Sequence, residues 1–283
     1  MQLSDQLPDK RLARRSFEHA AAGYDGAAVL QQEVAGRLLQ RLDLMKIRPQ
    51  RVLDLGCGTG QCIPGLMERY RGASVTALDI AFPMLAHARR RGRWLRRPAC
   101  VCADAERLPF ADASFDLVFS NLMLQWCVDI EAVFGELQRV MRPGGLLLFT
   151  SFGPDTLHEL RRSWSSVDGY SHVNAFLDMH DVGDALVRTR FRDPVMDVER
   201  LTVTYPDVWQ LMRELKQIGA HNVTAGRPRG LTGKSHMQRL VEAYENFRRD
   251  GVLPASYEIV NGHAWAAQDH ATISIPVDQL RRI

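Results

Sequence analysis

Short apolar runs alternate with amphipathic segments through the first half of the chain. Five runs have the length and composition of buried strands, at 51–55, 74–79, 99–103, 115–120 and 145–152. Between them, apolar residues recur at helical spacing over 61–70, 81–90 and 129–141. This alternation predicts an α/β fold, in which a parallel sheet carries helices on both faces. Two further helices are expected before the sheet, at 9–22 and 27–44.

The pattern changes after residue 152. The expected elements are helices at 155–166 and 179–188, a strand at 195–205, helices at 206–218 and 234–249, and a final strand at 256–266. The helical block at 206–250 lies between two predicted strands. We therefore interpret it as an insertion that covers the ligand-binding edge of the sheet.

The loop after the first predicted strand is rich in glycine. The sequence VLDLGCGTG places Gly56, Gly58 and Gly60 at alternate positions, and glycine lets a backbone turn tightly and approach a ligand closely. A dinucleotide fingerprint would need its third glycine one residue later, where this chain has Gln61. A P-loop is also excluded, because no Gly-Lys-Ser/Thr follows. The spacing favours a nucleoside ligand without a pyrophosphate.

Acidic residues end the next two predicted strands. Asp79 could accept hydrogen bonds from both ribose hydroxyls, and Asp104 could face an adenine amino group. Either carboxylate alone could instead cap a helix. Because the carboxyl ends of parallel strands meet at one edge of the sheet, the glycine loop and both acids are expected to form one site there.

These segments together resemble the class I S-adenosylmethionine-dependent methyltransferases. The resemblance rests on VLDLGCGTG, VTALDIAFPML, ADAERLPFADASFDLVFSN and ELQRVMRPGGLLLFTSF, which follow one another in the family's order. It implies a Rossmann-like sheet of seven strands, mostly parallel, with the last strand antiparallel. It also implies S-adenosyl-L-methionine as cofactor. The implied cofactor-binding residues are Asp54, Gly56, Cys57, Gly58, Gly60, Asp79, Ile80, Met84, Asp104, Ala105 and Asn121.

The rest of the chain resembles one family in particular, the malonyl-acyl-carrier-protein O-methyltransferases of biotin synthesis. The matching segments are RRSFEHAAAGYDGAAVLQQEVAGRLL, SNLMLQWCVD, SFGPDTLHELRRSW, LKQIGAHNVTAGRPRGLT and ASYEIV. The resemblance implies methylation of the free carboxylate of a malonyl thioester, so that fatty-acid enzymes extend the ester towards the pimeloyl precursor. The implied partner is malonyl-acyl carrier protein, or malonyl-coenzyme A. One domain is expected, with an N-terminal helical lid (1–45), a cofactor-binding half (46–152) and a substrate-side half (153–283).

The proposed chemistry needs no general base, because a carboxylate with a pKa of about 4 is ionised at neutral pH. Tyr24 is the candidate catalytic residue, since it follows a helix that could fold over the cofactor and matches the family's N-terminal tyrosine. An arginine is the natural ligand for the malonyl carboxylate. The candidate substrate residues are Phe17, Gln125, Trp126, His172, Arg227 and Arg229. Purely structural roles remain open for Tyr24, Trp126 and His172.

Composition excludes some classes of protein. The net charge of +3 does not indicate a nucleic-acid partner. Five cysteines, an odd number whose spacings fit no usual zinc site, argue against disulfides and for a reducing compartment. The chain shows neither a signal peptide nor an apolar run long enough to cross a membrane, so we expect a cytoplasmic protein.

Three alternative functions remain open. A related family of complex I assembly factors, associated with arginine hydroxylation, shares the glycine loop and a segment like FGPDTLHELR. The other two are a methyltransferase of a small molecule such as a quinone precursor, and a cofactor-binding module without catalysis.

Overall fold

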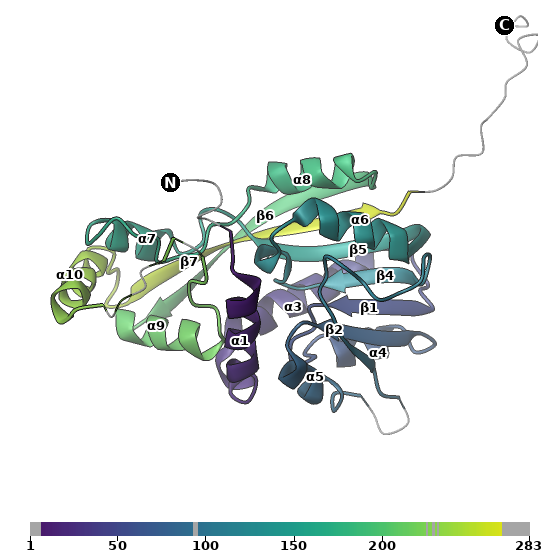
Figure 1. Ribbon diagram of the computed structural model, residues 1–283, viewed down its shortest axis with the longest axis horizontal. Helices are drawn as coiled ribbons and strands as arrows, with labels where there is room; N and C mark the ends of the chain where they lie inside the picture. The colour runs from purple at the N-terminus through teal and green to yellow at the C-terminus, as the bar shows by residue number, and fades with distance from the viewer. Residues whose placement is uncertain (1–6, 93–95, 225, 228–229, 231, 268–283) are drawn as a thin grey trace, which may run out of the picture.

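The computed structural model describes residues 7–92, 96–224, 226–227, 230 and 232–267. They include a seven-stranded sheet in the order β3-β2-β1-β4-β5-β7-β6 (Figure 1). The strands are β1 (Arg51–Leu55), β2 (Ser74–Asp79), β3 (Ala99–Cys102), β4 (Phe115–Ser120), β5 (Met141–Phe152), β6 (Arg192–Tyr205) and β7 (Leu253–Trp265). The α-helices are α1 (Lys10–Ala20), α2 (Tyr24–Ala27), α3 (Val29–Arg41), α4 (Ile63–Arg69), α5 (Phe82–Ala88), α6 (Ile130–Val140), α7 (His158–Ser165), α8 (Met179–Arg188), α9 (Val208–Gln217) and α10 (Lys234–Glu245).

The strand directions confirm the expected sheet. β1 pairs in parallel with β2 and β4, β2 with β3, and β4 with β5. The last strand, β7, runs antiparallel to both of its neighbours, β5 and β6. The sheet is therefore mostly parallel, and the carboxyl ends of β1, β2 and β4 lie at one edge. In such sheets that edge is where ligands bind.

Helices cover both faces of the sheet (Figure 1). On one face, α6 and α8 bury Phe134, Leu137 and Leu186 against the strands. On the other, α3 and α4 bury Leu38 and Leu66. All five side chains have no exposed surface, and each such burial stabilises the fold by roughly 1.5–3 kcal/mol. The glycine loop after β1 therefore projects from a rigid support.

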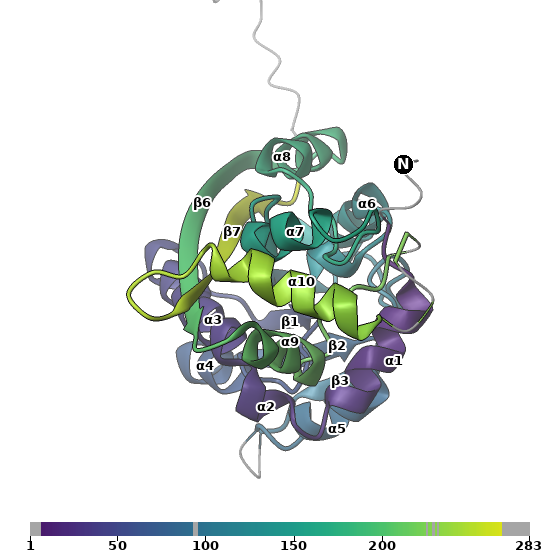
Figure 2. The ribbon, with the colours of Figure 1, turned by 90° about the vertical axis from the view of Figure 1, so that its left-hand side faces the viewer.

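A third apolar cluster fills the far end of β5, β6 and β7. The helices α9 and α10 lie between β6 and β7 in the chain and pack there with α7 (Figure 2). Tyr244 of α10 is fully buried, and its hydroxyl donates to the Pro254 carbonyl oxygen at 2.9 Å. The helical insertion expected before the last strand is thus confirmed. No helix among the described residues is long and apolar enough to span a membrane.

Several boundaries differ from the sequence expectations. The helix expected at 27–44 is divided into α2, α3 and a 3-10 turn, η2 (Leu42–Leu44), because Ala28 leaves the helical region at φ −83° and ψ 46°. The strand expected at 145–152 begins at Met141, and an irregularity between Phe115 and Leu117 takes up the extra residues. A 3-10 turn at Leu124–Trp126, η3, was not predicted.

Candidate active site

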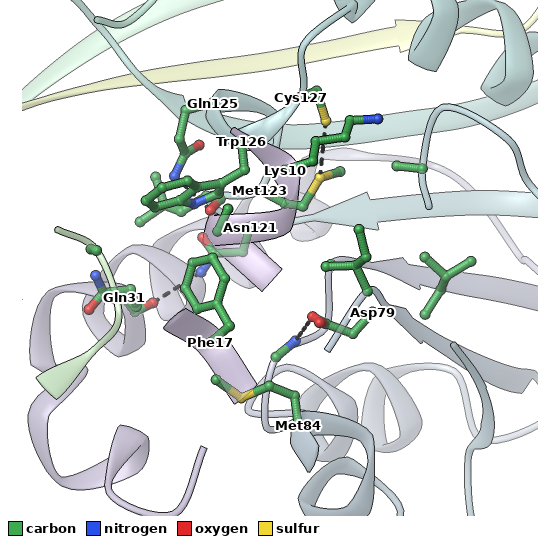
Figure 3. Close-up of a pocket in the computed structure, with 18 of the residues that line it drawn as sticks. Lys10, Phe17, Gln31, Asp79, Met84, Asn121, Met123, Gln125, Trp126 and Cys127 are labelled. Carbon is green, nitrogen blue, oxygen red and sulfur yellow. Dashed lines mark hydrogen bonds between the residues drawn. The ribbon is translucent and has the colours of Figure 1, made fainter. Parts of the chain in front are cut away.

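A cavity lies at the carboxyl ends of β1, β2 and β4, beneath helix α1. Its walls come from α1, the glycine loop, the segment after β4, and the part of the insertion just after α9, at Ile218 and Ala220. Figure 3 shows the side chains of Phe17, Asp79 and Trp126 around it. The predicted site residues that line it are Phe17, Tyr24, Gly56, Gly58, Asp79, Ile80, Met84, Asp104, Ala105, Asn121, Gln125 and Trp126.

The glycine loop forms the floor of this cavity. The backbone N–H groups of Gly56 and Cys57 both donate to the Leu78 carbonyl oxygen, at 2.8 and 2.9 Å, which fixes β1 to β2 where the loop begins. At Gly56, φ is +69° and a Cβ atom would lie 2.1 Å from Cγ of Met123. Only glycine fits there. Gly58 also has a positive φ and borders the cavity, with no atom within 4 Å of an added Cβ.

Asp79 ends β2 beside the loop. One of its carboxylate oxygens accepts from the backbone N–H of Gly58 at 2.9 Å, and the other from Ala81 N–H at 2.8 Å. Burial raises the pKa of Asp79, and the backbone hydrogen bonds oppose that rise. These bonds fix the carboxylate's orientation on the cavity wall.

A recess continues from the cavity to Asp54, the acid that precedes the loop. Tyr24, Gln31 and Gln61 also line this recess, together with Cys57. Asp54 is 1% exposed, and its Oδ2 atom has no hydrogen-bond partner among the described residues. Burial, with a smaller contribution from Asp79, raises the pKa of Asp54 to about 7. A buried carboxylate oxygen without a partner is costly, and a cationic or donor group of a ligand would satisfy it.

Asp104, after β3, pairs across the cavity with helix α1. The Lys10 ammonium lies 2.7 Å from a carboxylate oxygen of Asp104 and 2.5 Å from one of Glu106. Lys10 also lines the cavity. Sequence reasoning missed it, because nothing in the local pattern distinguishes Lys10 from the other basic residues of α1.

Aromatic side chains of the N-terminal segment close the cavity from above. The ring of Phe17 packs edge-on against the indole of Trp126 (Figure 3). Tyr24 is partly buried and packs with Ala81 and Met84. Burial raises the pKa of the Tyr24 phenol, with a further contribution from Asp79. The hydroxyl is therefore neutral at physiological pH and can donate a hydrogen bond.

A second polar contact fastens the same segment to the glycine loop. The Asp25 carboxylate accepts from Thr59 Oγ1 at 2.5 Å and Gln61 Nε2 at 3.0 Å, and it pairs with the Arg91 guanidinium. Burial alone would raise the pKa of Asp25, but these hydrogen bonds and the arginine charge lower it. The N-terminal segment is thus held to the rest of the domain at two points, Lys10 and Asp25.

Amides after β4 shape the remaining wall. Asn121 donates through Nδ2 to the Gln31 carbonyl oxygen at 3.1 Å and accepts from Thr150 Oγ1 at 2.9 Å. Gln125 donates to the Leu122 carbonyl oxygen at 2.7 Å. These bonds join α3, β5 and the turn η3 around the cavity.

Three of the predicted site residues line neither the cavity nor its recess, and a fourth is not described. Gly60, with φ +79°, packs against Ala88 instead, where an added Cβ would lie 2.8 Å from a backbone atom. His172 lines a separate hollow beside α7. Arg227 donates to the Thr224 carbonyl oxygen at 3.0 Å and does not line the cavity. Arg229 lies outside the described residues.

Solved structures share this fold. The YcgJ protein of Bacillus subtilis matches with a TM-score of 0.57 and 15% identity, covering 83% of this chain and 99% of that one. A phosphoethanolamine N-methyltransferase of Haemonchus contortus, solved with S-adenosylhomocysteine, matches with a TM-score of 0.52 and 22% identity, covering 83% of this chain and 52% of that one. The sequence model of a methyltransferase domain matches residues 53–149.

Curated relatives match almost the whole chain, lid and insertion included. The malonyl-[acyl-carrier protein] O-methyltransferase of Methylovorus sp. is 52% identical over 95% of this chain and 93% of its own length. That of Gallionella capsiferriformans is 52% identical over 93% of each. The family that the sequence resembles is therefore confirmed. The chain belongs to the malonyl-[acyl-carrier protein] O-methyltransferases.

Proposed function

We propose that this protein transfers a methyl group to the free carboxylate of a malonyl group held as a thioester on acyl carrier protein. The observation that carries the proposal is the 52% identity, over 95% of the chain, to a relative named for that reaction. This identity extends through the lid and the insertion, which form two walls of the cavity. It favours the proposal over the arginine-hydroxylase and small-molecule alternatives.

The methyl donor is S-adenosylmethionine, which supplies a methyl group on a positively charged sulfur. The cavity fits it in three places. Each Asp79 oxygen accepts one backbone N–H, which leaves further acceptor capacity for two ribose hydroxyls. The partnerless oxygen of Asp54 is suited to the amino group of the methionine part. Asp104 borders the cavity beyond β3, where it can accept from an adenine amine.

The cavity suits a nucleophile that is already charged. A carboxylate needs no base, but it reacts faster when water is removed from it. Phe17, Met84 and Trp126 are apolar walls that exclude water. Tyr24 is the candidate catalytic residue, since its neutral hydroxyl can orient the carboxylate by a hydrogen bond.

The expected arginine is not among the described residues that line the cavity. Among the described residues that line the cavity, Lys10 is the one cationic side chain, and it is already paired with Asp104 and Glu106. We infer that neutral donors hold the malonyl carboxylate. Neutral donors are chemically favourable here, because a close cation would stabilise the carboxylate and lower its reactivity as a nucleophile.

The ester formed would be the disguised malonyl primer from which the pimeloyl precursor of biotin is built. The proposed location is the cytoplasm, where malonyl thioesters are made. The odd number of cysteines and their spacings support a reducing compartment.

A transfer assay tests this function. Purified protein is incubated with methyl-labelled S-adenosylmethionine and, separately, with malonyl-acyl carrier protein, malonyl-coenzyme A or free malonate. We expect label on the carrier protein that mild base releases as methanol, and no transfer by an Asp79→Ala control that has lost the ribose receptor. Cofactor binding without transfer to any malonyl acceptor would refute the proposal and would favour the small-molecule or arginine-hydroxylase alternatives.

A further inference from the structure

A second hollow, of about 440 Å³, lies beside α7, outside the cofactor cavity. Its walls are Pro154 after β5, helix α7 and the loop that follows α7. Figure 2 places α7 next to α10 of the insertion. The residues that give this hollow its chemistry are Arg161, Trp164, Asp168, Tyr170, His172 and Phe176.

Arg161 supplies a positive charge without a close counter-ion. Its guanidinium donates to three backbone carbonyl oxygens, of Pro154 at 2.6 Å, Thr156 at 3.2 Å and Asn174 at 3.5 Å. No carboxylate of a described residue forms an ion pair with it. The carboxylate whose negative charge acts on the pKa of Arg161 is that of Asp155, and Asp155 pairs with Arg200 at 3.2 Å. Two of the five guanidinium N–H groups are therefore left for a ligand.

The one carboxylate that lines the hollow is already engaged. His172 Nε2 lies 2.9 Å from one oxygen of Asp168 and 3.1 Å from the other, and the Tyr170 N–H donates to Asp168 at 3.0 Å. The imidazole of His172 stacks on the Trp164 indole, with centroids 3.6 Å apart and an interplanar angle of 4°. The hollow thus combines a cation that has no ion-pair partner among the described residues with aromatic side chains in its lining.

The hollow and the cofactor cavity are neighbours. Phe152 lines the cavity, Phe176 lines the hollow, and their ring centroids are 5.5 Å apart. The insertion holds this region together, because Asn222 Nδ2 donates to the Ser171 carbonyl oxygen at 2.5 Å and Val223 N–H donates to Asn174 Oδ1 at 3.1 Å. A ligand that reaches the cavity past the insertion would pass this hollow.

We propose that the hollow binds the phosphate end of the pantetheine arm that carries the malonyl group, with Arg161 as the phosphate ligand. This inference rests on the proposed function. Carrier protein and coenzyme A present the same chemistry here, a phosphate followed by a chain of amides and methylenes. Arginine is well suited to phosphate, and the exposed Tyr170 and the partly buried Phe176 give the amide chain surfaces to lie on. His172, predicted from the sequence to orient substrate, would then contact the arm rather than the malonyl carboxylate.

The experiment compares two acceptors that differ only in the phosphate, malonyl-phosphopantetheine and malonyl-pantetheine. We expect Arg161→Met to raise KM for the phosphorylated acceptor roughly tenfold, the value of one charge-assisted hydrogen bond. KM for the unphosphorylated acceptor should stay unchanged. Arg161→Lys, which keeps the charge, should restore part of the difference. Arg162→Met is the matched control, because Arg162 is the next residue of α7, is exposed, and does not line the hollow.

A purely structural arginine would give a different result. If Arg161 only holds the loop through its three carbonyl contacts, Arg161→Met would change KM for both acceptors equally, and the proposal would be wrong. An unchanged KM for both would also overturn it. If the wild-type protein methylated neither small acceptor, the transfer assay with malonyl-acyl carrier protein would still test the proposed function separately. Calorimetry with phosphopantetheine and pantetheine alone would then decide the hollow: tighter binding of the phosphorylated form, lost in Arg161→Met, supports the site, and equal or no binding refutes it.

Discussion

The ring of Phe17 lies edge-on against the indole of Trp126, with ring centroids 5.0 Å apart and planes at 89°. Phe17 comes from the lid helix α1, and Trp126 from the turn η3 after β4. The two residues are far apart in sequence, yet both line the cofactor cavity. The pair therefore joins helix α1 to the turn after β4 at the wall of the cavity.

Removing either ring should open the lid. An edge-to-face pair contributes about 0.5–1.5 kcal/mol beyond the area it buries, so we expect Phe17→Ala to lower kcat/KM about tenfold or more. Trp126→Ala should do the same, and the double variant should be little worse than either single one, because both remove one contact. Steady-state kinetics with malonyl-acyl carrier protein checks this. Phe82→Ala is the control, because Phe82 is 65% exposed on α5; an equal loss there would contradict a lid-specific role.

The ion pair between Lys10 and Asp104 should act as a salt-sensitive fastening of the same lid. Their side chains are 25% and 38% exposed, so solvent limits the pair to about 0.5–1 kcal/mol. We expect Lys10→Met to speed cofactor dissociation a few-fold at low salt, with the difference shrinking at high salt. Stopped-flow release of S-adenosylhomocysteine measures it.

A matched variant separates this fastening from the general charge of α1. Arg14 pairs with Glu18 inside the same helix and makes no ion pair with the sheet among the described residues. Arg14→Met should leave cofactor release unchanged. If it speeds release as much as Lys10→Met does, the ion pair to Asp104 is not what holds the lid.

The sequence predicted the site residues that lie at the carboxyl ends of strands. Gly56 follows β1, Asp79 ends β2 and Asp104 comes two residues after β3, so their shared edge follows from the parallel order of those strands. The contacts of the lid could not be predicted in this way. Lys10 and Asp104 are separated by 94 positions, and their pairing depends on how α1 docks against the sheet. The hollow that His172 lines could not be predicted for a similar reason, because the path of the loop after α7 decides it.

Two glycine-to-alanine variants should change stability in opposite directions. Gly60 has φ +79°, and its Cβ would meet the Ala88 backbone at 2.8 Å. Gly60→Ala should therefore lower the free energy of unfolding by about 2 kcal/mol or more, from backbone strain and crowding. Gly36 lies inside helix α3, with nothing within 4 Å of an added Cβ. Gly36→Ala should raise the free energy of unfolding by about 0.5–1 kcal/mol.

Urea denaturation of both variants measures these changes. The contrast is informative because the chemical change is the same and only the backbone environment differs. A stable, fully folded Gly60→Ala protein would show that the turn between the loop and α4 can relax, and the tight approach of Gly60 to α5 would not be a requirement of the fold.

The buried Asp54 carboxyl should make stability depend on pH. Its pKa in the folded protein is raised to about 7, whereas an unfolded aspartate titrates near about 4. Between these values the folded state binds the extra proton, so this contribution to stability is complete below about pH 4 and is lost as pH rises towards 7. We expect the free energy of unfolding of the cofactor-free protein to fall across this window, by at most about 1.4 kcal/mol per pH unit from this group.

Asp54→Asn isolates this group, since an amide of similar shape does not titrate. We expect the variant to lose most of the decline in stability between about pH 4 and 7, even if its stability at any one pH is lower. Asp116→Asn is the control, because hydrogen bonds from the Gln50 and Arg51 N–H groups and pairing with Arg142 overcome the effect of burial and lower the pKa of Asp116. Its contribution is present above its unfolded pKa and lost only at lower pH, so the slope in this window should be unchanged. If the free energy of unfolding of wild type and Asp54→Asn changed equally with pH in this window, Asp54 would be ionised in the folded protein, and a further group would have to satisfy its Oδ2 atom.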